Sequence, residues 1–487
     1  MGDMIELALV LVPRLIFLRS LPIFNDEAIF LHWAYLWLQN PSHWWISLVL
    51  GSRQPGLTIL LGLTQLLPLD PLLSARLVGP MCGTITYLAL SRFDRQRNQT
   101  HSRLPLALLV GFSPYLLFFD RIALTESVVT MLASTAMVLA YHLLQKKSTS
   151  KSIILGLVLG IGWWMKSTML LVAVPIALAF FLRYLTDKKE RLQLLVSLTI
   201  AAGVAAVLVV PMQFHPLVHK ASVSEGSIFL LTRDEFLSIT AAARLDTGLT
   251  IIQWLLGYLT PIAVGLSAYA VYKRPRSAKV QYLLLFAILP IVLGSLSARL
   301  LTARYLIVSV PAILLLTHEG LSLLAGTGRN IVGVLLFGWM IFASGLLVTS
   351  PLSFYRYLGL FPKAQMDVSQ YVTSWPSGYG VIEAIRFIEN EATKHPAIVF
   401  IRLDAGNPES ALAAYLPRHD IPVLTTARLP EVLAHKKELE ESGAVLYFVS
   451  RGLQRAGLED RLVEIARFNK PLDSEYVGVY RIDITKK

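Results

Sequence analysis

The chain has 487 residues, of which 54% are hydrophobic and only 16% are charged, and its mean hydropathy is +0.58. Soluble domains carry about 25% charged residues, so this composition excludes an ordinary soluble protein and a disordered one. The single cysteine, Cys82, excludes a disulfide framework and the cysteine-rich metal sites. The formal net charge of +12 would fit a nucleic-acid-binding surface, which the distribution of charge can test.

The excess positive charge lies in the hydrophobic part of the chain. Residues 351–487 hold 17 Lys and Arg against 17 Asp and Glu, whereas residues 1–350 hold 27 against 15. A nucleic-acid interface needs basic residues clustered on a soluble face. Here the basic residues separate long apolar runs, which is typical of membrane topology. We therefore expect no nucleic-acid partner, a transmembrane domain over 1–350 and a second domain over 351–487.

Eleven apolar stretches predict membrane-spanning helices, because about 20 apolar residues cross a bilayer. They lie near residues 5–23, 71–91, 104–120, 122–145, 152–166, 168–184, 192–212, 248–272, 280–298, 303–320 and 330–350. Every second connecting loop is basic, with Arg92, Arg95, Arg97 and Arg103, then Lys146, Lys147 and Lys151, then Arg183, Lys188, Lys189 and Arg191, then Lys273, Arg274, Arg276 and Lys279, then Arg329. The positive-inside rule places these loops and the N-terminus in the cytoplasm. Eleven spans then place the C-terminal domain outside the plasma membrane.

After residue 350 the pattern changes to short alternating elements. We predict helices over 380–394, 429–442 and 455–468, and strands over 397–403, 422–425, 444–449 and 476–482. Alternation of helix and strand predicts a small α/β layer domain. The expected fold is thus a mostly α, multi-pass membrane protein with about 11 transmembrane helices and a C-terminal extracytoplasmic α/β domain.

The loops predicted to lie outside carry an unusual set of ionisable and aromatic residues. Ionisable groups at membrane depth are costly, so their convergence predicts a functional site. The tryptophan-rich first outer loop is typical of a segment that lies along the membrane interface. The candidate site residues are Asp26, Glu27, Arg53, Glu126, Lys166, Arg304 and Tyr305.

Each of these residues also has a structural explanation. Glu126 could simply begin a helix, where an acid suits the first turn. Lys166 could extend from a helix end to the headgroup region, and Arg304 could do the same or pair with an acid. The acids could also hold a divalent metal, but the family resemblance described below does not imply one, so we expect no cofactor.

The set of side chains suits the transfer of a sugar that a membrane lipid carries through phosphate. A carboxylate, Asp26 or Glu27, would take a proton from the acceptor hydroxyl. Cations would stabilise the charge on the departing phosphate, and Lys166, Arg53 and Arg304 are candidates. The sequence has no Gly-rich phosphate loop, so a soluble nucleotide donor is not expected.

Five short motifs occur in order along residues 10–320. They are Asp26-Glu27, Arg53-Gln54-Pro55-Gly56-Leu57, Ser113-Pro114 with Arg121 to Glu126, Gly162-Trp163-Trp164-Met165-Lys166, and Arg304-Tyr305-Leu306 with Pro311. With these motifs the chain resembles the polyprenyl-phosphate-sugar-dependent glycosyltransferases of the GT-C superfamily. The resemblance is to the protein O-mannosyltransferase and aminoarabinose transferase group in particular.

The resemblance implies an inverting transfer from a polyprenyl-phosphate-linked sugar to a glycan, lipid or protein acceptor. It implies that Asp26 holds the catalytic acid position with Glu27 beside it, and that Glu126 is a second acid. Lys166 and Arg304, with Tyr305, match positions associated with the carrier phosphate. Arg53-Gln54-Pro55 departs from the family pattern, because many relatives read Lys-Pro-Pro there.

Two other classes stay open from the residues alone. A secondary transporter or lipid flippase would place its binding site near the membrane midplane, often between internal repeats. The sequence contains no internal repeat. In a non-catalytic assembly factor Asp26, Glu126 and Lys166 need not converge, and side chains spread over more than about 15 Å, beyond the reach of one substrate, would favour that class.

Overall fold

The structure is a computed structural model that describes residues 2–51, 53–95, 103–402, 406–426, 435–451, 459–473 and 475–484. Its contacts divide the chain into two compact units. The first comprises Met1–Leu18, Trp45–Leu57 and Arg76–Ala364, and the second comprises Arg19–Trp44, Thr58–Ala75 and Gln365–Lys487. The second unit thus joins two N-terminal segments to the C-terminal part, and a domain boundary at residue 350 stays a prediction. Arg97 lies outside the described residues.

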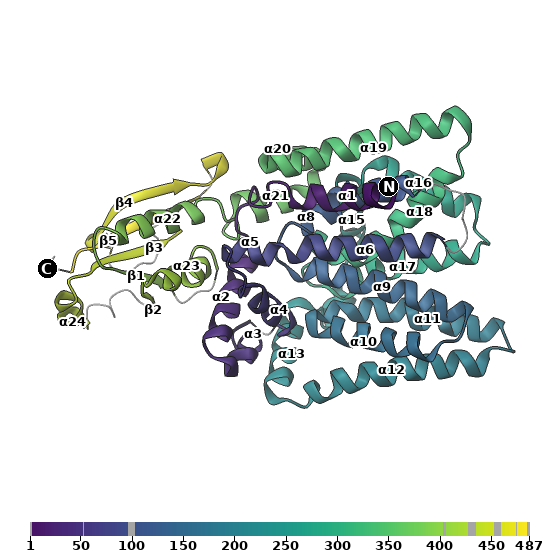
Figure 1. The fold of residues 1–487 in the computed structure, drawn as a ribbon, viewed down its shortest axis with the longest axis horizontal. Helices are drawn as coiled ribbons and strands as arrows, with labels where there is room; N and C mark the ends of the chain where they lie inside the picture. Colours follow the sequence, from purple (N-terminus) through teal and green to yellow (C-terminus); the bar gives the residue numbers. More distant parts are fainter. Residues whose placement is uncertain are drawn as a thin grey trace. The chain divides into compact units, whose positions relative to one another are not determined.

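The first unit is a bundle of helices (Figure 1). Its helices are α1 (Gly2–Leu15), α3 (Ile46–Gly51), α6 (Val78–Arg95), α7 (Leu104–Gly111), α8 (Pro114–Phe119), α9 (Thr125–Gln145), α10 (Thr149–Met165), α11 (Leu170–Thr186), α12 (Arg191–Gln213), α13 (Pro216–Phe229), α14 (Arg233–Ser238), α15 (Ala241–Leu259), α16 (Pro261–Lys273), α17 (Ala278–Ser297), α18 (Val310–Ser322), α19 (Gly326–Thr349) and α20 (Pro351–Leu358). Helix α10 packs against α9 and α12, and α17 packs against α11 and α18. The 3-10 segments η2 (Ser167–Met169) and η3 (Ala303–Ser309) precede α11 and α18.

Six helical segments in the described part of the chain are long and apolar enough to cross a membrane, and α15 with α16 would make a seventh. The expected span over 248–272 is bent by 109° between these two helices. The bend falls at Thr260, which has a φ of +76° and precedes Pro261. Proline cannot donate the backbone hydrogen bond that would continue α15.

Two other expected spans are shorter in the structure than in the sequence pattern. The stretch 104–120 is divided into α7 and α8, because the Ser113 side chain accepts from the Leu116 amide and Pro114 begins the second helix. The stretch 5–23 overlaps α1, which ends at Leu15, two residues before Phe17 with its φ of +50°.

A buried ion network joins three helices at one end of the bundle. Lys279, at the start of α17, lies 3.3 Å from Asp94 near the end of α6 and 3.1 Å from Glu319 near the end of α18. Arg274 also pairs with Glu319. Since removing one partner of such a buried set strands the others, the network holds these helix ends together.

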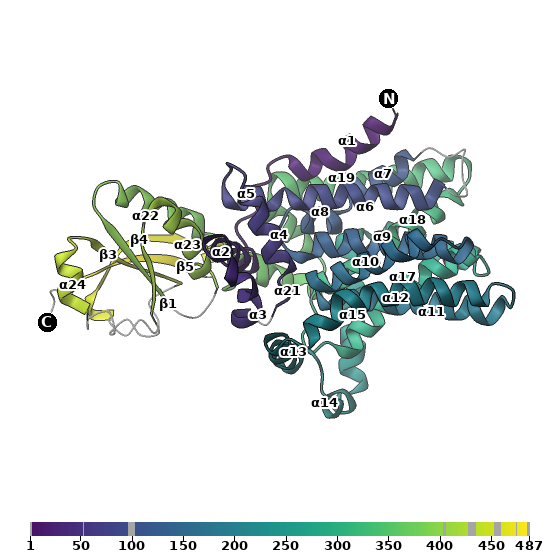
Figure 2. The ribbon, with the colours of Figure 1, turned by 60° about the horizontal axis from the view of Figure 1, so that its bottom comes forward.

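The second unit contains an α/β layer (Figure 2). Its main elements are α2 (Asn25–Gln39), most of α4 (Gly56–Thr64) and α5 (Pro71–Arg76), α21 (Gln365–Val368), α22 (Val381–Ala392), β1 (Ala397–Arg402), α23 (Glu409–Tyr415), β2 (Val423–Thr426), α24 (Lys436–Glu441), β3 (Val445–Ser450), β4 (Leu462–Asn469) and β5 (Tyr476–Ile482). The strand order is β2-β1-β3-β5-β4, with β1 parallel to both neighbours and β5 antiparallel to both of its own. Phe400, Phe448 and Tyr480 pack in its core.

The sequence-based prediction of this layer is confirmed for α22 and for the strands β1, β2, β3 and β5. The predicted helix over 455–468 is wrong, because Leu462–Asn469 forms the strand β4. Pairing with β5 decides this segment, and a register shift between Glu464 and Ala466 accommodates it. The predicted helix over 429–442 corresponds in its described part to α24. Residues 427–434, and residues 452–458 near the other predicted helix, lie outside the described residues.

Candidate functional site

Three of the predicted site residues meet at the ends of separate elements of the first unit. Glu126 lies in the first turn of α9, Lys166 directly follows α10, and Tyr305 lies in η3. The Lys166 Nζ is 2.6 Å from the Glu126 Oε1 and 5.0 Å from the centre of the Tyr305 ring. The Glu126 side chain is 2% exposed and that of Lys166 is 20% exposed. The structure therefore forms a nearly buried ion pair beside an aromatic ring.

Glu126 and Lys166 each lie at the end of a helix that favours the sign of their charge. Glu126 lies at the N-terminus of α9, where the helix dipole stabilises negative charge. Lys166 ends α10 in an extended conformation, with φ −164° and ψ 135°, at the terminus where the dipole stabilises positive charge. Because α9 and α10 run in opposite directions with a short connection, the start of one helix lies beside the end of the other.

Arg304 adds a second cation to this group. Its guanidinium carbon is 5.9 Å from the centre of the Tyr305 ring. The positive charges of Arg304 and Lys166 both act on the Glu126 carboxylate. Two cations and one carboxylate carry one net positive charge, and an arginine with a lysine suits the recognition of a phosphate.

The Arg53 motif lies against the motif that ends at Lys166. A Cβ at Gly56 would be 2.6 Å from the Trp164 carbonyl oxygen and 2.9 Å from the Met165 sulfur. Only glycine permits this approach without displacing the Trp164 backbone. The structure thus places the short segment that carries Arg53 in contact with the end of α10.

Three buried arginines hold the end of α1 in place. Arg121 donates to the carbonyl oxygens of Pro13 at 2.9 Å and of Ile16 and Phe17 at 2.6 Å. Arg76 donates to the carbonyl oxygen of Leu18 at 3.0 Å. The Pro13 carbonyl lies in the last turn of α1 and the others follow the helix, where helical partners are missing and cations are favourable.

The third of these arginines, Arg14, forms an ion pair with Asp120 at 2.8 Å and also donates to the Val110 carbonyl oxygen at 3.0 Å. The side chains of all three arginines are fully buried. The sequence pattern did not indicate Arg14 or Arg76 as functional candidates. The sequence feature that could have identified them is the presence of charged residues inside otherwise apolar stretches that predict membrane spans.

Asp26 and Glu27 lie in the second unit, in the first turn of α2. Both side chains are buried, with exposed fractions of 6% and 0%. The Glu27 Oε2 accepts a hydrogen bond from the Phe24 amide at 2.9 Å, which is the carboxylate half of a capping box. In the structure Glu27 caps its own helix, and the Asp26 Oδ1 lies 3.5 Å from the Asn25 Nδ2.

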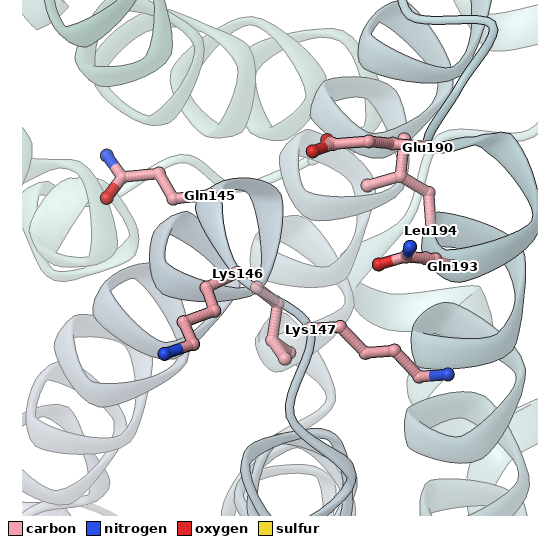
Figure 3. A pocket seen from close by; sticks show the side chains of 7 residues that line it. Gln145, Lys146, Lys147, Glu190, Gln193 and Leu194 are labelled. Atoms are coloured by element: carbon pink, nitrogen blue, oxygen red, sulfur yellow. The ribbon is translucent and has the colours of Figure 1, made fainter.

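A hollow of about 340 Å³ lies at the opposite end of the bundle, between α9 and α12 (Figure 3). Its lining residues are Leu143, Gln145, Lys146, Lys147, Glu190, Gln193 and Leu194. It contains no residue of the predicted site. In the part of the chain that the structure describes, no group of three or more His, Cys, Asp or Glu side chains is arranged to hold a metal.

Comparisons with known proteins bear on the fold and on the family resemblance. Residues 53–215 match the family described as dolichyl-phosphate-mannose-protein mannosyltransferase, and this range contains three of the five motifs. The structure is similar to that of ArnT from Cupriavidus metallidurans in the apo state, with 14% identity, coverage of 98% of this chain and 97% of that chain, and a TM-score of 0.62. The predicted resemblance is confirmed.

Two further structures extend the comparison. ArnT from Cupriavidus metallidurans bound to undecaprenyl phosphate has 13% identity, the same coverage of both chains and a TM-score of 0.60. The archaeal oligosaccharyltransferase AglB from Archaeoglobus fulgidus, in complex with an inhibitory peptide and a dolichol-phosphate, has 11% identity, coverage of 92% and 69%, and a TM-score of 0.53. A comparison with curated proteins finds no match. The chain thus has an ArnT-like membrane-protein fold over nearly its whole length.

Proposed function

We propose that this protein is an integral membrane glycosyltransferase that moves a sugar from a polyprenyl-phosphate donor to a glycan, lipid or protein acceptor. The observation that carries the proposal is the Lys166–Glu126 pair, with Arg304 and Tyr305 beside it, on an ArnT-like fold. Undecaprenyl phosphate is bound in an ArnT structure and dolichol-phosphate in an AglB structure. These two ligands support a polyprenyl phosphate as the carrier.

In the proposed reaction Asp26 accepts the proton of the acceptor hydroxyl while its oxygen attacks the anomeric carbon. The bond from that carbon to the phosphate oxygen breaks, and the polyprenyl phosphate leaves with the bonding electrons. Attack from the face opposite the leaving phosphate inverts the anomeric centre. Lys166 and Arg304 stabilise the negative charge that develops on the departing phosphate.

The remaining candidates support the phosphate site. Glu126 holds the Lys166 ammonium in place until the phosphate arrives, since its carboxylate is only 2.6 Å away. The Tyr305 ring lies beside both the Lys166 ammonium and the Arg304 guanidinium and attracts them through cation–π interactions. Arg53 is a third cation, on the segment in contact with the end of α10. These assignments require no metal.

The proposal places the site on the extracytoplasmic face of the plasma membrane. Lys146 and Lys147 lie at the other end of α9, beside the hollow of Figure 3. The positive-inside rule assigns that end to the cytoplasm, with the N-terminus. The Glu126 end of α9 then faces outward, and we extend the same orientation to the C-terminal α/β domain.

The test uses the purified full-length protein with a panel of polyprenyl-phosphate sugars, and measures the release of polyprenyl phosphate. Asp26→Asn should abolish turnover and keep binding of the carrier phosphate. Asp234→Asn, at an exposed acid of α14, is the matched control and should keep both activities. Full turnover by Asp26→Asn would remove Asp26 as the base.

The same protein in sealed vesicles tests the competing class. The broken helix pair α15 and α16 is a feature that transporters also use. Uptake of a labelled solute with no release of polyprenyl phosphate from any donor would overturn the transferase proposal in favour of transport.

A further inference from the structure

The start of α2, which carries Asp26, is held by residues from the C-terminal part of the second unit. The Asn25 amide donates to the Pro376 carbonyl oxygen at 3.0 Å. The Asn407 Nδ2 donates to the Ile23 carbonyl oxygen at 3.0 Å and to that of Pro376 at 3.4 Å. Asn407 is 2% exposed. One buried amide therefore joins the segment before α2 to the loop that binds the Asn25 backbone.

Close packing surrounds these hydrogen bonds. The Phe24 ring packs against the Tyr371 ring with their centres 4.7 Å apart. A Cβ at Gly378 would lie 1.7 Å from the Ile23 carbonyl oxygen, so the two backbones meet with no room for a side chain. Helix α23 packs along α2. The residues directly before Asp26 are thus fixed on several sides.

A buried lysine also binds the loop that contains Pro376. The Lys470 Nζ donates to the Ser374 carbonyl oxygen at 2.9 Å and pairs with the Glu475 carboxylate at 3.1 Å. Ser374 precedes by two residues Pro376, whose carbonyl oxygen receives both the Asn25 and the Asn407 donors. The position of α2 therefore depends on contacts that begin at Lys470, in the connection between β4 and β5.

From these contacts we infer that the C-terminal α/β domain is a scaffold for Asp26 and that Asn407 is a positioning residue for the proposed base. The inference rests on the proposed function for the role of Asp26. Asn407 acts through the Ile23 and Pro376 carbonyls, so its effect reaches Asp26 through the backbone. A general base must lie within about 2.6–3.2 Å of the proton that it takes, and a displacement of about 1 Å can cost a factor of about 100 in rate.

The first measurement compares Asn407→Asp, which keeps the shape of the side chain and removes its N–H donors, with the wild-type full-length protein. We expect kcat to fall about 10- to 100-fold. The KM for the polyprenyl-phosphate sugar should stay within about twofold, because the proposed reaction assigns the carrier phosphate to other residues, Lys166 and Arg304. Asn390→Asp, at an exposed position of α22, is the matched control and should leave both constants unchanged. An unchanged kcat, or a raised KM alone, would overturn the inference.

The second measurement does not depend on turnover. Hydrogen exchange of peptides that cover residues 22–28 should be slow in the wild type and faster in Asn407→Asp, or in Asn407→Ser if the first variant does not fold. Rapid exchange of the Asn25 amide in the wild type would overturn the scaffold without any variant. If the wild type transfers no sugar while the exchange result holds, the proposed function fails and the scaffold stands.

Discussion

Replacing Lys166 by methionine tests the ion pair at the proposed phosphate site. The Lys166 Nζ is 2.6 Å from the Glu126 Oε1, and Glu126 is almost fully buried. Removing one partner of a buried pair costs about 3–5 kcal/mol, because the other charge stays buried. Two features lower this cost: the Lys166 side chain is 20% exposed, and Arg304 also acts on Glu126. We expect Lys166→Met to lower the free energy of unfolding by about 2–3 kcal/mol.

The reverse change should cost less. Glu126→Gln leaves an ammonium that reaches solvent, and we expect a loss of about 1 kcal/mol. The double variant removes both charges and should lose about 1–2 kcal/mol, less than the about 3–4 kcal/mol that the two single changes lose together. The difference, about 2 kcal/mol, is the coupling energy of the pair.

The assay is chemical unfolding of the purified protein in detergent, followed by tryptophan fluorescence. Lys220→Met, at an exposed lysine of α13, is the control and should change stability by no more than about 0.5 kcal/mol. If the loss of unfolding free energy in the double variant equals the sum of the two single losses within about 0.5 kcal/mol, the reasoning is refuted. The same Lys166→Met protein should bind polyprenyl phosphate about 10- to 100-fold more weakly, since a hydrogen bond to a charged group contributes about 1.5–3 kcal/mol.

Three further outcomes follow from the structure. Arg14→Met should lower the free energy of unfolding by about 3–5 kcal/mol because it strands the buried Asp120 carboxylate, and adding Asp120→Asn should recover part of that loss in the same unfolding assay. Gly56→Ala should reduce sugar transfer at least about tenfold, because its Cβ would meet the backbone before Lys166, whereas Gly265→Ala, which faces open space, should not. Hydrogen bonds from Thr232 and then Arg299 lower the pKa of Glu235 from 4.5 to about 2, so their support of the α14 loop is present above pH 4.5 and is lost as the pH falls toward 2. Pepsin cleavage in residues 229–240 should rise over that range, and no rise would contradict this assignment.

The meeting of Glu126 and Lys166 could be predicted because it depends only on helix order. Two consecutive spans that run in opposite directions place residues 126 and 166 at the same end. The apolar runs that predict α9, α12, α17 and α19 are long enough to identify without tertiary information. The breaks at Thr260 and Ser113 follow from local geometry next to a proline, which an average over a whole span does not resolve.

The support of α2 could not be predicted in this way. Asn407 and Ile23 are 384 residues apart, and neither belongs to a periodic pattern that would indicate the partner. The capping role of Glu27 could not be predicted either. A carboxylate at the start of a helix can be a cap or a catalytic base, and the sequence does not distinguish the two. The strand β4 was mistaken for a helix because pairing with β5, and not its own sequence, determines its conformation.

The hydrogen bonds of Arg121 require a specific side chain at position 121 but only backbone atoms from their acceptors. Pro13, Ile16 and Phe17 contribute only their carbonyl oxygens, which every amino acid possesses. Position 121 must supply several donors from one fully buried, planar group, which only arginine does. Sequence change should therefore be tolerated at Pro13 and Ile16 and rejected at Arg121, including the change to lysine, whereas the φ of +50° at Phe17 disfavours β-branched residues at that position. Saturation mutagenesis of these four positions would reveal this asymmetry directly.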